Sequence, residues 1–325
     1  MIVVTGGAGF IGSCMVWKLN TMGRTDVLVV DEKGDVSPKS SNWNPAKVLG
    51  YMDKSVFISE VRQGKYPDVE AVFHMGACSA TTEMNREYLR ENNFLYTKTL
   101  CEWALEKGAR FIYASSAATY GSGDAGYTDA DLVTPKLKPL NPYGESKQMF
   151  DLWLLENKLS EKVAGFKFFN VYGPNEYHKG DMRSVVHKGY QQIKNEGKIR
   201  LFKSYRPDFA DGEQKRDFIY VKDVVETMAW FWKNPSVGGI YNLGAGKAES
   251  WNCFARAIFS ALKMEPCIEY IEMPENLRDQ YQYWTEADLT KLQRAGVSAS
   301  FSSLQDGVAD YVRYLESVSP YMVVS

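Results

Sequence analysis

Short apolar runs alternate with longer stretches of helical periodicity over the first half of the chain. Each run is rich in β-branched or aromatic residues and has few polar positions, which is typical of a strand buried on both faces of a sheet. The runs span residues 2–5, 27–30, 71–74, 110–114 and 163–170, and the helical stretches span residues 9–22, 84–107 and 142–159. This alternation predicts an α/β fold with a doubly wound parallel sheet covered by helices on both sides.

After Pro174 the alternation breaks into short helices and loops. It returns at residues 217–221 and 239–243 and then breaks again. We therefore expect a second, smaller α/β domain that is formed by two separate pieces of the chain. The predicted large domain comprises residues 1–171 and 215–246, and the predicted small domain comprises residues 172–214 and 247–325.

The composition is that of a soluble globular protein. The 325 residues are 45% hydrophobic and 24% charged, with a formal net charge of -2. Without an excess of positive charge, the chain has no field that attracts nucleic acids or acidic membranes, and no apolar run is long enough to span a bilayer. Residues 1–17 lack the basic leader of a signal peptide. We expect no nucleic-acid partner and no membrane association.

Cysteine and histidine usage indicates which disulfide and metal sites to expect. The five cysteines are an odd number without a C-x-x-C pair, which fits neither a disulfide framework nor a zinc site. Three histidines and no clustered acids give no support for a metal site. A reducing cytoplasm is the expected location.

A glycine-rich turn follows the first strand directly, because residues 5–12 read T-G-G-A-G-F-I-G. At such a strand-to-helix turn, backbone N–H groups and the positive helix end converge on a pyrophosphate, and side chains at the glycines would block it. Asp31 ends the second strand, nineteen residues after Gly12, where a carboxylate accepts hydrogen bonds from the adenosine ribose. The large domain is therefore predicted to be a Rossmann-type dinucleotide-binding domain, and the small domain to bind substrate.

The choice between NAD and NADP stays open at the residue level. Asp31 and Glu32 would repel a 2′-phosphate, whereas Lys33 and Lys39 are close enough in the sequence to compensate. Both lysines are equally compatible with a solvated loop.

Tyr143 and Lys147 lie four residues apart at the start of a predicted helix, for which Asn141 is a suitable cap and Pro142 a suitable first residue. This spacing places both side chains on one helix face. A free tyrosine titrates near about 10, so a nearby ammonium is needed to favour the phenolate that accepts a proton from a sugar hydroxyl. Ser116 follows the fourth apolar run, at the sheet edge where ligands of doubly wound folds bind. Its hydroxyl is predicted to orient the substrate oxygen.

Three segments together resemble the extended short-chain dehydrogenase/reductase family of nucleotide-sugar enzymes. They read T-G-G-A-G-F-I-G at residues 5–12, A-S-S-A-A-T-Y-G at 114–121 and Y-G-E-S-K at 143–147. Family members that act as 4,6-dehydratases carry an Asp-Glu pair where this chain has Ala117 and Ala118. Without those carboxylates elimination lacks an acid and a base, so redox epimerisation is favoured.

Longer segments at residues 74–83, 169–180, 215–218 and 280–289 are similar to the branch of this family that inverts C6 of an ADP-linked heptose for lipopolysaccharide. The resemblance implies an isomerase with tightly bound NADP, NAD being possible, and a nucleotide-sugar substrate. It also implies a homo-oligomer, specifically a pentamer. The alternatives are another nucleotide-sugar epimerase, such as a UDP-glucose 4-epimerase, or a nucleotide-sugar reductase. A catalytically silent dinucleotide sensor is disfavoured because Ser116, Tyr143 and Lys147 are all present.

The resemblance assigns a role to each matching position. The catalytic set is Tyr143, Lys147, Ser116 and Lys179, the last as a second acid/base. The residues implied to bind the coenzyme are Gly6, Gly9, Phe10, Ile11, Gly12, Asp31, Glu32, Lys39, Lys54, Met75, Gly76, Ala77, Ser79, Asn92, Tyr143, Lys147, Val171 and Lys179. The residues implied to bind the substrate are Ser116, Asn170, Asp181, Lys188, Phe202, Lys203, Ser204, Arg216 and Tyr281.

Several of these assignments have a structural alternative. Asn170 binds either the sugar or the sheet edge. Arg216 pairs either with the diphosphate, whose oxygens match its fork, or with neighbouring Asp217; we favour the diphosphate. Tyr281 contacts the nucleotide or packs in the core. His74 ends a buried strand and is predicted to be a packed core residue.

The chain also departs from the family pattern. Glu32 and Met75 stand where polar or amide residues are expected at the coenzyme, and Asp181 replaces a small hydroxyl residue. His187 is one residue out of register with a family histidine and carries little weight. Residues 205–214 look like an insertion. These departures leave the coenzyme choice and the sugar fit open, but not the fold.

Overall fold

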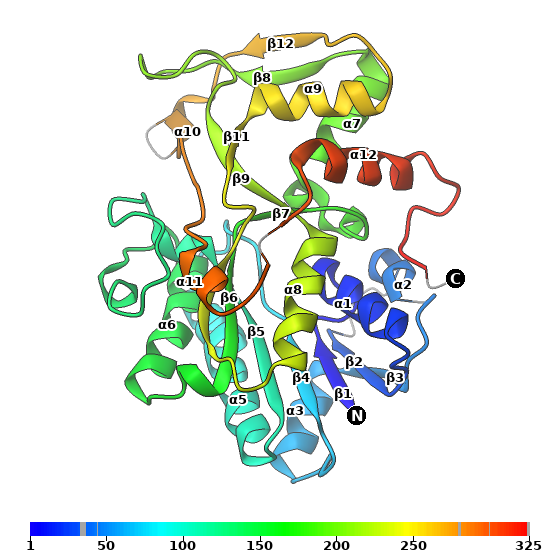
Figure 1. Cartoon of the computed structure of the whole chain (residues 1–325), viewed down its shortest axis with the longest axis vertical. Helices are drawn as coiled ribbons and strands as arrows, with labels where there is room; N and C mark the ends of the chain where they lie inside the picture. Colours follow the sequence, from blue (N-terminus) through cyan, green and yellow to red (C-terminus); the bar gives the residue numbers. More distant parts are fainter. Residues whose placement is uncertain (33–36, 44, 279–280, 299, 324–325) are drawn as a thin grey trace.

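The computed structural model describes residues 1–325 apart from 33–36, 44, 279–280, 299 and 324–325 (Figure 1). Its centre is a seven-stranded sheet in the order β10-β6-β5-β4-β1-β2-β3, in which every pair of neighbours is parallel. The strands are β1 (Ile2–Thr5), β2 (Val27–Asp31), β3 (Gly50–Asp53), β4 (Ala71–His74), β5 (Arg110–Ser116), β6 (Val163–Phe168) and β10 (Gly239–Leu243). The predicted doubly wound parallel sheet is confirmed.

Helices cover both faces of this sheet (Figure 1). The helices on one face are α1 (Phe10–Thr21), α2 (Ser37–Trp43) and α8 (Val221–Lys233), and those on the other are α3 (Lys54–Arg62), α5 (Tyr96–Glu106) and α6 (Pro142–Glu156). Alternate residues of β1 point to opposite faces: Val4 belongs to the apolar cluster of α1 and α8, whereas Val3 packs with Phe57 of α3 and Leu100 of α5. All four side chains are fully buried, as the apolar runs predict.

One prediction about the strands is wrong. The run 163–170 is not one strand, because β6 ends at Phe168 and β7 (Asn170–Tyr172) joins a second sheet. That sheet has the order β11-β9-β7, so β9 (Lys215–Tyr220) lies outside the central sheet. Phe168 and Phe169, where the chain leaves the central sheet, are both buried and apolar, so the sequence pattern does not mark the change of sheet. The edge strand β3 was also missed because its residues are only half-buried and do not alternate.

The long predicted helix 84–107 is interrupted by a π-helical segment. It consists of α4 (Arg86–Leu89), the π segment Arg90–Leu95 and α5. The π segment contributes the buried Asn93, whose side chain donates to the Cys78 carbonyl at 3.0 Å and to Ser146 Oγ at 3.0 Å. Asn93 therefore links the loop after β4 to α6. The predicted helix 142–159 ends earlier, at Glu156.

Most of the remaining elements lie beyond the carboxyl ends of the central strands, whereas the helix at residues 290–294 packs beside β10 at the edge of the sheet (Figure 1). They include a two-stranded parallel sheet of β8 and β12. The elements are α7 (Val185–Glu196), β8 (Ile199–Phe202), β11 (Ala248–Ser250), α9 (Trp251–Ala261), β12 (Ile268–Ile271), α10 (Glu275–Arg278), α11 (Thr290–Arg294) and α12 (Leu304–Leu315). The division into two domains stays a prediction. Among the described residues, no helix is long and apolar enough to cross a membrane.

Candidate active site

A cavity of about 630 Å³ lies at the carboxyl ends of the central strands. Turns that follow β1, β4, β5 and β6 all contribute to its wall, as expected for the ligand site of a doubly wound sheet. Most of the predicted site residues line it: Gly6, Gly9, Phe10, Ile11, Gly12, Asp31, Lys39, Met75, Gly76, Ala77, Ser79, Ser116, Tyr143, Lys147, Asn170, Val171 and Lys179. The fold thus brings together residues that are up to 173 positions apart in the sequence.

The glycine-rich turn forms a tight cradle between β1 and α1. Gly6 has φ +64°, and a Cβ there would lie 2.6 Å from the Gly76 backbone nitrogen. A Cβ at Gly12 would lie 2.1 Å from the Gly6 carbonyl oxygen. Gly9 caps α1 without a side-chain acceptor, so the first N–H groups of the helix can donate to an anion. These features fit the pyrophosphate of a dinucleotide.

The buried Asp31 carboxylate faces this turn. One of its oxygens accepts a hydrogen bond from the Ala8 backbone at 3.0 Å, and the other lies 3.1 Å from Lys39 Nζ. Lys39 lines the cavity, so it adds positive charge where the ribose end of a dinucleotide is expected. Lys33 lies outside the described residues.

Three predicted coenzyme residues form a chain beside the cavity but do not line it. Glu32 Oε1 is 3.1 Å from Lys54 Nζ, which also donates to Asn92 Oδ1 at 2.8 Å. Because Lys54 balances the charge of Glu32, the repulsion that Glu32 would exert on a phosphate is reduced.

Helix α6 begins as predicted. Asn141 accepts from the Gly144 backbone at 2.8 Å, and Pro142 is the first helical residue. Lys147, one turn after Tyr143, is 5% exposed and donates to the Ala114 carbonyl at 2.8 Å. Burial lowers the pKa of Lys147 to about 8.

Tyr143 and Ser116 lie against each other in the same cavity. Burial raises the pKa of Tyr143, and its hydrogen bond with Ser116 opposes that rise. Ser116 Oγ also accepts from the Ala118 backbone at 3.1 Å, which fixes the hydroxyl. A proton acceptor, a buried cation and an orienting hydroxyl are therefore assembled at one point.

Lys179 approaches the cavity from a different segment, the 3-10 turn Tyr177–Met182. Its Nζ lies 5.4 Å from the centre of the Phe10 ring, and burial lowers its pKa while Glu176 opposes that effect. An amine with a lowered pKa is suited to exchange a proton near neutral pH.

The Lys179 turn is anchored by residues far along the chain. Tyr177 Oη donates to the Pro320 carbonyl at 2.6 Å. The buried Met322 donates its backbone N–H to Asn175 Oδ1 at 3.2 Å. Residues beyond α12 therefore hold the segment that presents Lys179.

Arg216, Tyr281 and Phe202 do not line the cavity, but they form its neighbouring layer. The Arg216 guanidinium lies 5.1 Å from the Tyr281 ring centre and 6.0 Å from that of Trp251, which does line the cavity. Trp251 Nε1 donates to Tyr281 Oη at 2.8 Å, and Phe202 packs edge-on against Tyr281. Tyr281 is therefore both packed among other side chains and adjacent to the cavity. This position is compatible with a contact to the nucleotide and with core packing.

Asn170 and Asp217 make local contacts that bear on two of the alternatives. Asn170 donates to the Asp217 carbonyl at 2.9 Å, so its amide bonds the sheet edge while it lines the cavity. The Asp217 carboxylate accepts from the backbone of Ala245, Gly246 and Ala287. Among the described residues, these backbone donors and not Arg216 are the hydrogen-bond partners of the carboxylate, and the Arg216 guanidinium donates to the Lys215 carbonyl at 2.9 Å.

Four further predicted substrate residues lie away from the cavity wall: Asp181, Lys188, Lys203 and Ser204. Lys203 Nζ is 2.7 Å from Glu272, and the Ser204 backbone donates to Asp211. The first of these contacts occupies the lysine with a surface ion pair.

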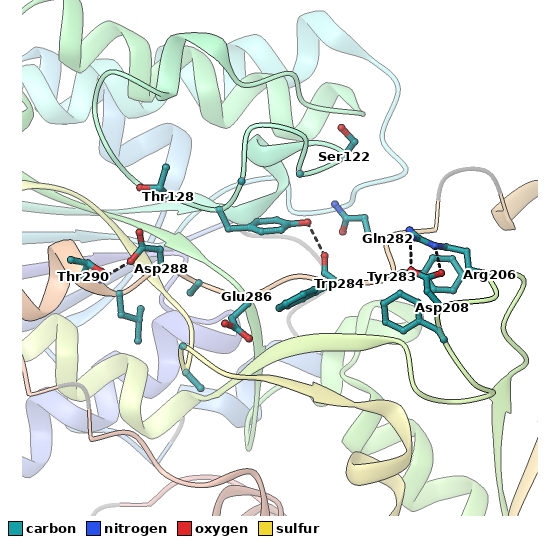
Figure 2. A pocket seen from close by; sticks show the side chains of 18 of the residues that line it. Ser122, Thr128, Arg206, Asp208, Gln282, Tyr283, Trp284, Glu286, Asp288 and Thr290 are labelled. Carbon is teal, nitrogen blue, oxygen red and sulfur yellow. Dashed lines mark hydrogen bonds and ion pairs between the residues drawn. The ribbon is translucent and has the colours of Figure 1, made fainter.

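The segment that looked like an insertion borders a second cavity of about 890 Å³ (Figure 2). Arg206 pairs with Asp208 and lies over the Tyr283 ring, and Trp284 lies further along the wall. This cavity shares no described lining residue with the first and contains none of the predicted catalytic side chains. Although it is larger, we assign the active site to the first cavity.

Sequence reasoning missed some residues that line the first cavity, notably Thr81, Arg183 and Trp251. Trp251 begins α9 after a serine cap, but a first helical residue carries no signal for a ligand.

The interpretations of His74 and His187 can be compared with the surroundings of each residue. His74 is bonded on both ring nitrogens, to Thr5 Oγ1 at 2.5 Å and Thr97 Oγ1 at 2.7 Å, as a packed core residue. His187 is buried near Tyr177 and does not line the cavity.

Comparison with known proteins adds independent information. A model of the NAD dependent epimerase/dehydratase family matches residues 2–244. The chain is 55% identical over 324 residues to an ADP-L-glycero-D-manno-heptose-6-epimerase of Nitratidesulfovibrio vulgaris, covering 99% of this chain and 100% of the relative. It is 48% identical to the Fusobacterium nucleatum protein of that name, with the same coverage. The crystal structure of the Helicobacter pylori protein of that name superposes with a TM-score of 0.80 at 26% identity, covering 98% of this chain and 96% of the other.

Proposed function

This chain belongs to the NAD dependent epimerase/dehydratase family, and we propose that it converts ADP-D-glycero-D-manno-heptose to ADP-L-glycero-D-manno-heptose by inverting C6. The relatives that cover the full chain carry the name of this epimerase. The observation that carries the proposal is that two separate proton-transfer groups, Tyr143 and Lys179, line one cavity beside the glycine-rich turn. This product would supply heptose for lipopolysaccharide.

The turn at Gly6, Gly9 and Gly12 fits the coenzyme, with Asp31 and Lys39 at its ribose end. We infer NADP, with NAD as the alternative, because Lys39 provides a cation for a 2′-phosphate and Lys54 neutralises Glu32. A carbinol C–H is not acidic enough to be deprotonated directly, so the bound nicotinamide supplies hydride removal from, and hydride return to, the same carbon.

The side chains of this protein move the protons. The Tyr143 phenolate accepts the proton of the C6 hydroxyl as that carbon is oxidised to a ketone between C5 and C7, while Ser116 orients the oxygen and the Lys147 ammonium stabilises the phenolate. Rotation about the C5–C6 bond, which joins the ketone carbon to the ring, presents the opposite face of the ketone. The oxygen then lies at a second position, where Lys179 donates the proton that completes the new hydroxyl. Because Ala117 and Ala118 have no carboxylate, elimination of water has no acid and base of its own here.

The remaining attributes follow from the family resemblance. We propose a cytoplasmic homo-oligomer, a pentamer, which sedimentation equilibrium tests directly. The five unpaired cysteines support a reducing compartment.

The function is tested by proton NMR of the purified protein with ADP-D-glycero-D-manno-heptose in deuterated water without added coenzyme. The expected result is the L-glycero epimer with no deuterium at C6, because hydride returns from a coenzyme that never leaves. If no epimer appears even with added NADP or NAD, the heptose assignment is wrong. Net consumption of coenzyme would instead identify a reductase.

The role of Tyr143 is tested by Tyr143→Phe, with Tyr88→Phe as a matched control on the surface. We expect Tyr143→Phe to lower kcat by about 10²–10⁴-fold with coenzyme still bound, because only the proton acceptor is lost. The control should be unchanged. Undiminished turnover of Tyr143→Phe would exclude it as the acid/base.

A further inference from the structure

A buried ion pair lies directly behind the catalytic side chains. Asp151 is on α6, one turn after Lys147, and Lys167 is on β6. Their charged atoms are 2.8 Å apart, and both side chains are 0% exposed. None of the steps proposed above uses either residue.

The Asp151 carboxylate connects α6 to the two central strands that border the site. One oxygen accepts from Tyr113 Oη at 2.8 Å. The other accepts from Ser115 Oγ and from Lys167 Nζ, each at 2.8 Å. Tyr113 and Ser115 are on β5 immediately before Ser116, so the carboxylate fixes α6 against the strand that presents Ser116.

Lys167 extends this network to the turn after β5. Its Nζ donates to Thr119 Oγ1 at 2.9 Å and lies 5.3 Å from the centre of the Tyr120 ring. The turn that follows Ser116 is therefore held by the same ion pair that holds α6.

Stability alone does not account for such a pair. Desolvation offsets most of the attraction between two buried charges, and apolar replacements of similar volume are often equally stable. A buried polar network that is fully hydrogen-bonded does, however, specify one arrangement of the elements that it joins. The elements joined here are the ones that carry Tyr143, Lys147 and Ser116.

The charged groups around Lys147 also connect Asp151 to the catalytic side chains. The titratable groups that interact with Lys147 are Asp151 of α6, Cys78 of the loop after β4 and the neutral His74 of β4, and Tyr143 precedes it by one turn on the same helix. Burial lowers the pKa of Lys147, and Asp151 contributes the largest opposing effect.

We propose that Asp151 and Lys167 form a positioning pair for this reaction, in which the pair fixes α6 against β5 and the Asp151 carboxylate keeps the Lys147 side chain charged. This inference rests on the proposed function, because it assigns Lys147 as the ammonium that stabilises the Tyr143 phenolate. Neither residue of the pair touches the substrate.

The test compares Asp151→Asn and the double variant Asp151→Asn/Lys167→Met with Tyr113→Phe and Ser115→Ala. The first two variants remove the carboxylate charge. The single variant leaves Lys167 as an unpaired buried charge, whereas the double variant leaves none, so we expect the double variant to fold even if the single variant does not. The two controls each remove one hydrogen bond to the same carboxylate and leave its charge in place. Thermal unfolding and coenzyme binding establish that each variant is folded.

We expect the carboxylate-free variants to have kcat lowered at least 10-fold at pH 8, with KM within 2-fold of the wild type. The alkaline limb of the kcat profile should move down by about 1 pH unit, because without Asp151 the Lys147 ammonium loses its proton at lower pH. The limb should not move in Tyr113→Phe or Ser115→Ala. A folded double variant with an unmoved limb, or with wild-type kcat, would overturn the proposal.

A second measurement separates this proposal from the proposed function. Carbon-13 NMR of the labelled lysine side chains reads the titration of Lys147 directly, without turnover. If the wild type turns over no heptose substrate, the proposed function fails, while a lower titration midpoint in the double variant still supports the role of Asp151. An unchanged midpoint would refute it in either case.

Discussion

Replacing Gly12 by alanine would place a methyl group 2.1 Å from the Gly6 carbonyl oxygen and 2.9 Å from the Gly7 Cα. In an ordinary helix this substitution stabilises by up to about 1 kcal/mol, because alanine is the better helix former. Here both neighbours are backbone atoms, and overpacking of this kind costs about 1–3 kcal/mol. Once the gain of about 1 kcal/mol is subtracted, we expect a net loss of up to about 2 kcal/mol, the reverse of the usual effect.

The same displacement should weaken coenzyme binding. Gly6 also accepts the Gly9 N–H at 2.9 Å, so moving its carbonyl opens the turn that cradles the pyrophosphate. Isothermal calorimetry with NADP should show affinity at least 10-fold weaker, and thermal unfolding should shift down by a few degrees. Gly50→Ala is the matched control, since nothing lies within 4 Å of a Cβ there. If Gly12→Ala binds NADP as tightly as the wild type and melts no lower, the steric argument is refuted.

Three further predictions concern proton transfer and pH. Lys179→Met should lower kcat by about 10²-fold or more with bound coenzyme retained, which single-turnover NMR checks; normal turnover would contradict its role. Wild-type kcat should fall as pH rises above about 8, where Lys147 loses its proton, and a profile that is flat to pH 10 would exclude this. Burial lowers the pKa of His74 to about 3. The contribution of neutral His74 to the free energy of unfolding is therefore fully present above about pH 6.5 and falls by about 1.4 kcal/mol per pH unit between that pH and about 3. Urea unfolding at pH 7 and pH 5 should show a smaller loss of stability for His74→Gln than for the wild type.

The elements that sequence reasoning placed correctly are those determined by local pattern. Strand β1 and the glycine turn are specified by adjacent residues, and the cap at Asn141 fixes where α6 begins. Once the start of α6 is known, the spacing of Tyr143 and Lys147 places them on one face. Each of these inferences needs only a few neighbouring residues, and the structure has each in the predicted place.

The features that escaped sequence reasoning depend on distant partners. The division of 163–170 at Phe169 is invisible in the sequence because Phe168 and Phe169 are both apolar and buried, so the pattern does not mark the change of sheet. The position of Arg216 between Trp251 and Tyr281 is set by three segments that meet only in the folded chain. The ion pair of Asp151 and Lys167 likewise joins a helix to a strand, and neither position shows a motif.

The anchoring of the Lys179 turn has a consequence for how the protein matures during translation. Tyr177 and Asn175 bond to residues that lie 143 and 147 positions later in the sequence. A ribosome therefore exposes the glycine turn and α6 well before it has made the residues that hold Lys179. Because domains fold progressively during synthesis, we expect a nascent chain to be able to take up its coenzyme before the turn that carries Lys179, the proposed second acid/base, is fixed, and to acquire the ability to epimerise last.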